Sequence, residues 1–123
     1  MPPEVRFASR VYRWAAIYGI VVLALAYFQP VPDPWHLTHL GFVGTALVFQ
    51  GVFLVIARDP RRFEPLMLLT VFEKISFGIP AVAFWARGQA DGAAAVFGLV
   101  DLLLAALFAT AWLRTRRTQS AEG

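Results

Sequence analysis

Long apolar runs dominate the pattern of residues along the chain. Four of them cover residues 11–28, 37–57, 66–86 and 93–113, and short polar segments separate them. Because the hydrocarbon core of a bilayer is about 30 Å thick, a helix needs roughly 20 apolar residues to cross it. Three of the runs reach that length, and the first approaches it once Val11 and Tyr12 are included. The pattern therefore predicts an all-α, transmembrane four-helix bundle.

The composition points to the same class of protein. The chain is 59% hydrophobic and only 15% charged, whereas a soluble domain is usually about 25% charged. The segments between the runs are too short to build a core of their own. We therefore expect residues 1–123 to form one integral-membrane domain without an extramembrane enzyme or receptor module. The absence of cysteine excludes thiol-based catalysis and cysteine-ligated metal sites.

The cations are distributed unevenly between the two sides of the predicted bundle. Nine of the eleven Lys and Arg residues flank the first run, the middle loop and the end of the fourth run: Arg6, Arg10, Arg13, Arg58, Arg61, Arg62, Arg114, Arg116 and Arg117. The opposite side carries only Arg87, and Lys74 lies inside a run. The positive-inside rule then places both termini and the middle loop in the cytoplasm. Because these cations follow the helix ends, they do not indicate a nucleic-acid surface.

The N-terminal segment has an alternative interpretation. Arginines followed by an apolar run that ends Ala24-Leu25-Ala26 resemble a signal peptide with a small-residue cleavage site. The run continues through Tyr27 and Phe28, however, to an aromatic anchor typical of a membrane span. Cleavage would leave three spans and would not change the orientation of the others.

Aromatic and small residues predict how the helices face lipid and one another. Indole and phenol rings favour the headgroup level, and small residues allow helices to approach closely within the bilayer. The expected aromatic anchors are Trp14, Trp112 and Tyr12 on the cytoplasmic side and Trp35 and Trp85 on the other. The expected contact positions are Ala15 and Gly19 in the first run, Gly41, Gly44 and Gly51 in the second, Gly78 and Ala81 in the third, and Ala94, Gly98, Asp101, Ala105 and Ala109 in the fourth.

Polar residues inside the runs converge on one depth. At about 1.5 Å of rise per residue, Glu73 and Lys74 lie roughly 11 to 14 Å from the cytoplasmic edge, and Gln50 reaches a similar depth. Asp101 lies about 12 Å from the outer edge, within reach of Lys74, and Tyr18 lies somewhat nearer the cytoplasm. Charged groups at such depth are costly unless they are paired. We therefore take these five residues as candidate ligand or proton sites.

The expected partners within this group follow from helix geometry. Lys74 and Asp101 should form an ion pair between the third and fourth helices. Because adjacent residues project about 100° apart, Glu73 should point away from Lys74 and meet Tyr18 or Gln50. Two acids against one base leave one carboxyl without a counter-ion, and we expect one acid to be protonated. The group could serve only to hold the helices in register, or it could bind a ligand or carry protons.

The remaining polar motifs give weaker signals. His36 and His39 lie three residues apart near an outer loop, but two ligands on one helix make a poor zinc site, so we expect no metal and no cofactor. No set of nucleophile, base and orienting group is present, which argues against an enzyme. Arg58, Arg61 and Arg62 in the middle loop either anchor the topology or bind a lipid headgroup.

The chain resembles a family of small bacterial membrane proteins. The residues that carry the resemblance are Gly41–Gly51, the motif Ala57-Arg58-Asp59-Pro60-Arg61, the run from Pro65 to Lys74, and Asp101 with Leu107-Phe108. Their layout is similar to that of DoxX-like proteins with four spans. The resemblance implies a multi-pass protein of the bacterial inner membrane and implies no activity. Small multidrug-resistance exporters are of similar length, but their signature is a glutamate in the first span, and residues 14–28 contain no acid.

These observations lead to two functional expectations. The first is a non-enzymatic bundle that binds a lipid-like ligand, a membrane-protein partner or a second copy of itself. The alternative is a proton-coupled transporter or carrier of a small molecule. In both cases the bilayer is a partner, and the mid-membrane polar residues bind the ligand or partner or carry the protons.

Overall fold

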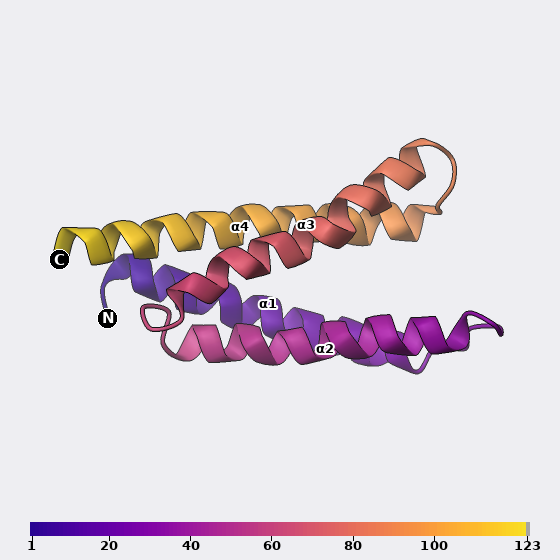
Figure 1. Cartoon of the computed structure of the whole chain (residues 1–123), viewed down its shortest axis with the longest axis horizontal. Helices are drawn as coiled ribbons and strands as arrows, with labels where there is room; N and C mark the ends of the chain where they lie inside the picture. The colour runs from indigo at the N-terminus through magenta and orange to yellow at the C-terminus, as the bar shows by residue number, and fades with distance from the viewer. Residues whose placement is uncertain (123) are drawn as a thin grey trace.

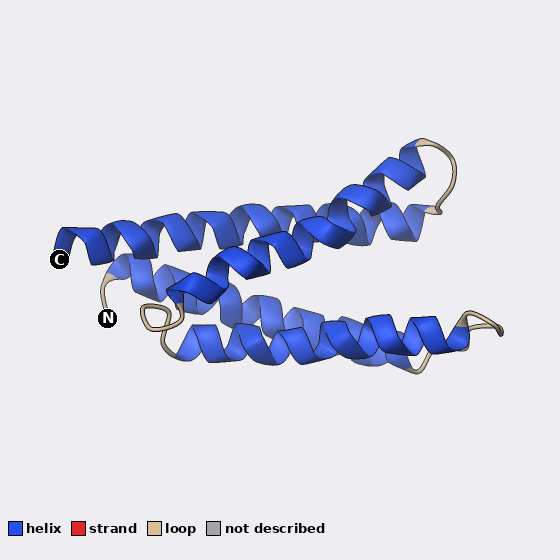
Figure 2. Cartoon of the chain, viewed as in Figure 1, coloured by secondary structure: helices blue, strands red, loops and turns tan. Residues whose placement is uncertain are grey.

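The computed structural model describes residues 1–122, and these residues form four helices without any strand (Figures 1 and 2). The helices are α1 (Pro3–Tyr27), α2 (His36–Arg58), α3 (Glu64–Ala86) and α4 (Gly92–Glu122). All four are long and apolar enough to cross a membrane. The prediction of an all-α bundle with four candidate spans is therefore confirmed.

Two helices extend well beyond the apolar runs that predicted them. α1 begins at Pro3, where proline is tolerated because the first helical N–H has no partner within the helix. α4 continues nine residues past the predicted end of its span at residue 113 and reaches Glu122. At 1.5 Å per residue, this extension adds about 14 Å. Both extensions lie at the end of the bundle where the chain begins and ends (Figure 1).

The four helices form two antiparallel hairpins. α1 packs along α2, α3 packs along α4, and the hairpins meet mainly through α1 and α4, whereas α2 and α3 barely touch. The termini and the loop between α2 and α3 lie together at one end, which we call the arginine-rich end because all nine flanking arginines belong to it (Figure 1). The hairpins diverge toward the opposite end, which carries the other two loops (Figure 1).

The tightest packing lies toward the arginine-rich end and is centred on Tyr12. This residue is fully buried, and its ring stacks on Phe108 with centroids 4.3 Å apart and meets Phe53 edge-on at 5.9 Å. The Tyr12 hydroxyl lies 2.7 Å from the hydroxyl oxygen of Thr70 in α3. One side chain of α1 thus contacts residues of all three other helices. The expectation that Tyr12 belongs to the exposed aromatic anchors is wrong.

The expectation for the glycines is correct in α3 and α4 but wrong for two glycines of α2. A Cβ at Gly78 would lie 2.8 Å from Leu102 and 3.0 Å from the carbonyl oxygen of Gly98, so the two backbones touch there. A Cβ at Gly41 or Gly51 would meet nothing within 4 Å. The reason is that α2 packs almost only against α1, and these two glycines lie on exposed faces of α2.

This contrast gives a testable difference between two identical substitutions. Gly78→Ala should destabilise the protein by about 1 to 3 kcal/mol, because the added methyl group forces α3 and α4 apart. Gly51→Ala should be neutral or slightly stabilising, since alanine is the better helix former and its methyl group meets no neighbour. Thermal unfolding of both variants in detergent compares them directly. Equal losses would contradict the close α3–α4 contact.

Candidate functional site

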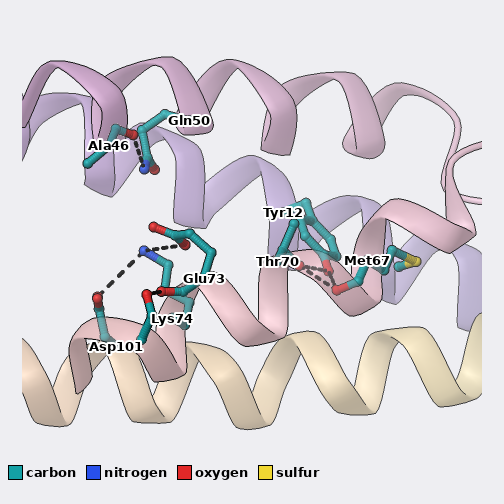
Figure 3. A network of polar contacts seen from close by, with 9 residues as sticks. Tyr12, Ala46, Gln50, Met67, Thr70, Glu73, Lys74 and Asp101 are labelled. Carbon is teal, nitrogen blue, oxygen red and sulfur yellow. Dashed lines mark hydrogen bonds and ion pairs between the residues drawn. The ribbon is translucent and has the colours of Figure 1, made fainter. Parts of the chain in front are cut away.

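The centre of the candidate site is an ion pair between α3 and α4. Lys74 Nζ lies 3.5 Å from Asp101 Oδ1 and donates a hydrogen bond to it (Figure 3). Gly98 and Ala105, one turn to either side of Asp101, are both buried, and Gly98 packs against Gly78 and Ala81 of α3, so Asp101 lies on the inward face of α4. The Lys74 side chain is only 8% exposed. The predicted pairing of Lys74 with Asp101 is confirmed.

Glu73 belongs to the same ion-pair cluster, contrary to the sequence-based expectation. Its Oε2 lies 3.7 Å from Lys74 Nζ, so one ammonium group serves two carboxyl groups. The expectation failed because it considered only the directions in which adjacent side chains leave the helix. Four methylene groups allow the lysine to swing its ammonium group back toward its neighbour. We call Glu73, Lys74 and Asp101 the charged triad.

The charged triad is attached to the aromatic core. Lys74 Nζ lies 5.2 Å from the centroid of the Phe53 ring, a cation–π distance. Phe53 comes from α2 and also packs against Tyr12 and Phe108. The Lys74 ammonium group thus lies near two carboxyl groups and near the Phe53 ring. The sequence did not single out Phe53, because one phenylalanine among eleven carries no signal of its own.

Gln50 enters the site from the other hairpin. Its side chain is buried, and its amide nitrogen donates a 2.9 Å hydrogen bond to the carbonyl oxygen of Ala46 in the preceding turn of α2. The amide packs on Gly19 of α1, where any larger residue would overlap it. Figure 3 shows the Gln50 amide and the Glu73 carboxyl group pointing toward one another from α2 and α3.

Two buried acceptors of the site have no hydrogen-bond donor among the described residues. They are Gln50 Oε1 and Glu73 Oε2. Buried polar atoms in native proteins are nearly always hydrogen-bonded, so an exception calls for a specific reason. Gln50 lies on α2 of one hairpin and Glu73 on α3 of the other, and these two helices barely touch. Gln50 Oε1 packs against Gly19 of α1, and Glu73 Oε2 lies beside the Lys74 ammonium group, so each acceptor has a close neighbour but no hydrogen bond.

Tyr18 does not take part in the ion pairs. Its side chain is 39% exposed and lines a groove between α1 and α4.

Of the arginines in the middle loop, Arg61 pairs with Glu122 at 2.5 Å, and its carbonyl oxygen accepts a 2.8 Å hydrogen bond from Gln119. These bonds tie the middle loop to the end of α4. Arg58 and Arg62 are exposed at the arginine-rich end.

The two histidines hold the opposite end of the first hairpin together. His36 Nδ1 lies 3.1 Å from the carbonyl oxygen of Val31, and His39 Nε2 lies 2.8 Å from that of Ala26. Each ring therefore bonds backbone near the loop that joins α1 to α2. Over residues 1–122, no three His, Cys, Asp or Glu side chains are grouped as a metal site would require.

The chain matches no protein-family model, no curated protein and no solved structure. The interpretation of the site therefore rests on its own geometry: a charged triad inside a bundle of helices long and apolar enough to cross a membrane, near a glutamine whose side-chain oxygen accepts no hydrogen bond within residues 1–122.

Proposed function

We propose that this protein is a non-enzymatic membrane protein that binds a lipid-like ligand, with a hydrogen-bond donor of the ligand placed between Glu73 and Gln50. The observation that carries the proposal is the pair of buried acceptors, Glu73 Oε2 and Gln50 Oε1, without a donor among residues 1–122. An ammonium group has three donors and can bond both acceptors, whereas a hydroxyl can donate to only one of them. Since α2 and α3 barely touch, an apolar tail could leave toward lipid between them.

The charge of the site favours the same ligand class. Two carboxyl groups surround one ammonium group, so the ammonium group can balance only one carboxylate when both acids are ionised. A cationic or neutral donor is compatible with that charge, whereas a phosphate would meet two acids. The Glu73 and Asp101 side chains are 21% and 19% exposed, although the Oε2 atom of Glu73 itself is buried.

The direct test is the lipid content of the purified protein. Glu73→Gln keeps the shape of the side chain but removes its charge and replaces one acceptor oxygen by a donor. We expect the wild-type protein to retain a specific lipid-like molecule through gentle purification and the variant to lose it while its unfolding temperature changes little. Mass spectrometry of organic extracts from equal amounts of protein measures the difference.

Glu64→Gln is the matched control, because it makes the same chemical change at the start of α3, away from the triad. It should retain the molecule at the wild-type level. If wild type, Glu73→Gln and Glu64→Gln carry identical extracts, the triad serves only to hold α3 and α4 together.

A proton-coupled carrier is the second candidate. It is favoured by the unequal count of two carboxyl groups and one ammonium group, because the unbalanced acid could take up and release a proton. In this case wild-type protein in liposomes should move protons in response to a transported ligand, and Glu73→Gln should not. The measurement separates the two candidates, since simple binding predicts no proton flux in either protein.

The same proposal includes an orientation in the bacterial inner membrane, supported by the resemblance to DoxX-like proteins and by the nine arginines at one end. A reporter fused after Gly123 should be cytoplasmic, and one inserted at Asp33 should be periplasmic. The reverse pattern would contradict the charge argument.

A further inference from the structure

A second feature lies on the outside of the bundle, in a groove between α1 and α4. The groove has a volume of 410 Å³, and nine residues line it: Phe7, Arg10, Val11, Trp14, Ala15 and Tyr18 from α1, and Val100, Leu104 and Leu107 from α4. The α1 residues follow helical spacing and form one face of that helix. Apart from Arg10 and the Tyr18 hydroxyl, the side chains of the groove are apolar or carry only an indole N–H.

The two ends of this groove differ in charge. Arg10 lines it at the arginine-rich end, and the guanidinium group of Arg114 lies 4.5 Å from the ring centroid of Phe7, another lining residue. Within residues 1–122, neither arginine forms an ion pair with a carboxylate, since Lys74 and Arg61 supply the cation in every such pair. At the other end, at Tyr18, no charged side chain lines the groove. The groove is therefore cationic at one end and apolar along its length.

The length of the groove matches one leaflet of a bilayer. Phe7 and Tyr18 are eleven residues apart on one helix, which corresponds to about 16 Å. Half of a hydrocarbon core is about 15 Å. Trp14, which is 65% exposed, lies on the groove between these ends. A lipid acyl chain that follows the groove from Tyr18 to Phe7 would thus place its headgroup at the arginine-rich end, near Arg10 and Arg114.

We infer that this groove binds an anionic phospholipid, with one acyl chain against α1 and α4 and the phosphate between Arg10 and Arg114. The charge of the two guanidinium groups selects an anionic headgroup, and the apolar walls accept the chain. This site is independent of the ligand proposed for the charged triad. That ligand avoids phosphate and lies on the α2–α3 side of the bundle, whereas this lipid lies on its α1–α4 side.

Trp14 provides a probe at the groove. A variant that retains only this tryptophan (Trp35→Phe, Trp85→Phe, Trp112→Phe) is placed in liposomes that contain brominated phosphatidylglycerol or brominated phosphatidylcholine. We expect phosphatidylglycerol to quench Trp14 at lower mole fractions. Arg10→Gln and Arg114→Gln should each reduce the preference about fivefold, since each removes one guanidinium group that contacts the phosphate, and one exposed ion pair contributes up to about that factor.

The control is Arg62→Gln, which removes an exposed arginine from the middle loop at the same end. It should leave the preference unchanged within twofold. An equal loss with Arg62→Gln would show that general surface charge is responsible and would overturn the inference. Equal quenching by both lipids, or shielding of Trp14 from both in a dimer, would also overturn it.

A second measurement does not depend on the single-tryptophan variant. Native mass spectrometry of the otherwise unaltered protein, released from mixed-lipid nanodiscs, counts the phospholipids that stay bound. The wild type should retain one phosphatidylglycerol in preference to phosphatidylcholine, and Arg10→Gln should lose that preference. Equal retention of the two lipids by the wild type would overturn the inference by this route as well.

Discussion

Replacement of Lys74 by methionine is expected to destabilise the protein by about 3 to 5 kcal/mol, the usual cost of removing one partner of a buried ion pair. Lys74 faces Asp101 at 3.5 Å and Glu73 at 3.7 Å, so its loss leaves two acids together in an apolar bundle. Asp101→Leu should cost less, because Glu73 still pairs with the lysine. Unfolding in detergent micelles measures both variants.

The double variant tests the pairing itself. Adding Asp101→Leu to Lys74→Met removes one of the stranded acids, so the double variant should be more stable than the sum of the two losses implies, by about 0.5 to 3 kcal/mol. Arg87→Met is a suitable control, since it removes an exposed cation from the opposite end and should change stability by less than about 0.5 kcal/mol. Additive losses would show that Lys74 and Asp101 do not interact.

The second large effect is expected at Tyr12. Truncation to alanine should cost about 3 to 5 kcal/mol, as for other large buried aromatic side chains, because the ring contacts Phe53 and Phe108. Tyr12→Phe should cost only about 1 kcal/mol, since it removes the 2.7 Å bond to Thr70 and a long 3.5 Å bond to the carbonyl oxygen of Met67, which the Thr70 hydroxyl also bonds.

Trp14→Ala is the control for Tyr12, because it truncates an aromatic residue two positions later that is 65% exposed. Its effect on stability should be within about 0.5 kcal/mol. If Trp14→Ala lowers the free energy of unfolding as much as Tyr12→Ala does, the buried aromatic core is not centred on Tyr12. The same unfolding assay compares all three variants.

The sequence was sufficient to predict the number of helices and their approximate positions. In lipid every backbone polar group must be satisfied within its own segment, so an apolar run of about 20 residues leaves little choice but a helix. The pairing of Lys74 with Asp101 was predictable for a similar reason: depth along a helix is nearly linear in residue number, and two opposite charges at one depth attract.

The sequence did not predict how each helix faces its neighbours. Tyr12 was expected at the headgroups because tyrosine commonly occurs there, but its rotation about the axis of α1 turns it into the bundle. Gly41 and Gly51 were expected in contacts, yet α2 has almost no contact with α3. Rotation and neighbour choice depend on which hairpins meet, and residue type alone carries little information about this.

Glu73 illustrates a limit of helix geometry as a predictive tool. Its direction relative to Lys74 follows from the 100° step between residues, but the position of the charged atoms depends on side-chain torsions. A long lysine side chain can reach a neighbour on the same helix, and the 3.7 Å distance between Nζ and Oε2 reflects this. The sequence could not predict that Glu73 Oε2 and Gln50 Oε1 lack a hydrogen-bond donor, because this depends on how the two hairpins pack.

Photo-crosslinking beside Glu73 in native membranes tests the central proposal most directly. Phe77 lies one turn from Glu73 on α3, is half-buried, and packs near Phe42 of α2 with ring centroids 5.8 Å apart. p-Azidophenylalanine at this position should capture a discrete lipid-like molecule on illumination, detected by mass. The same probe at Phe84, an exposed position of α3, should capture bulk lipid only.

The decisive comparison adds Glu73→Gln to each probe. We predict that the discrete adduct at Phe77 disappears with Glu73→Gln, while the bulk-lipid adducts at Phe84 remain unchanged. An adduct at Phe77 of the same mass and yield with and without the Glu73 carboxyl group would contradict the proposal that this acid binds a ligand.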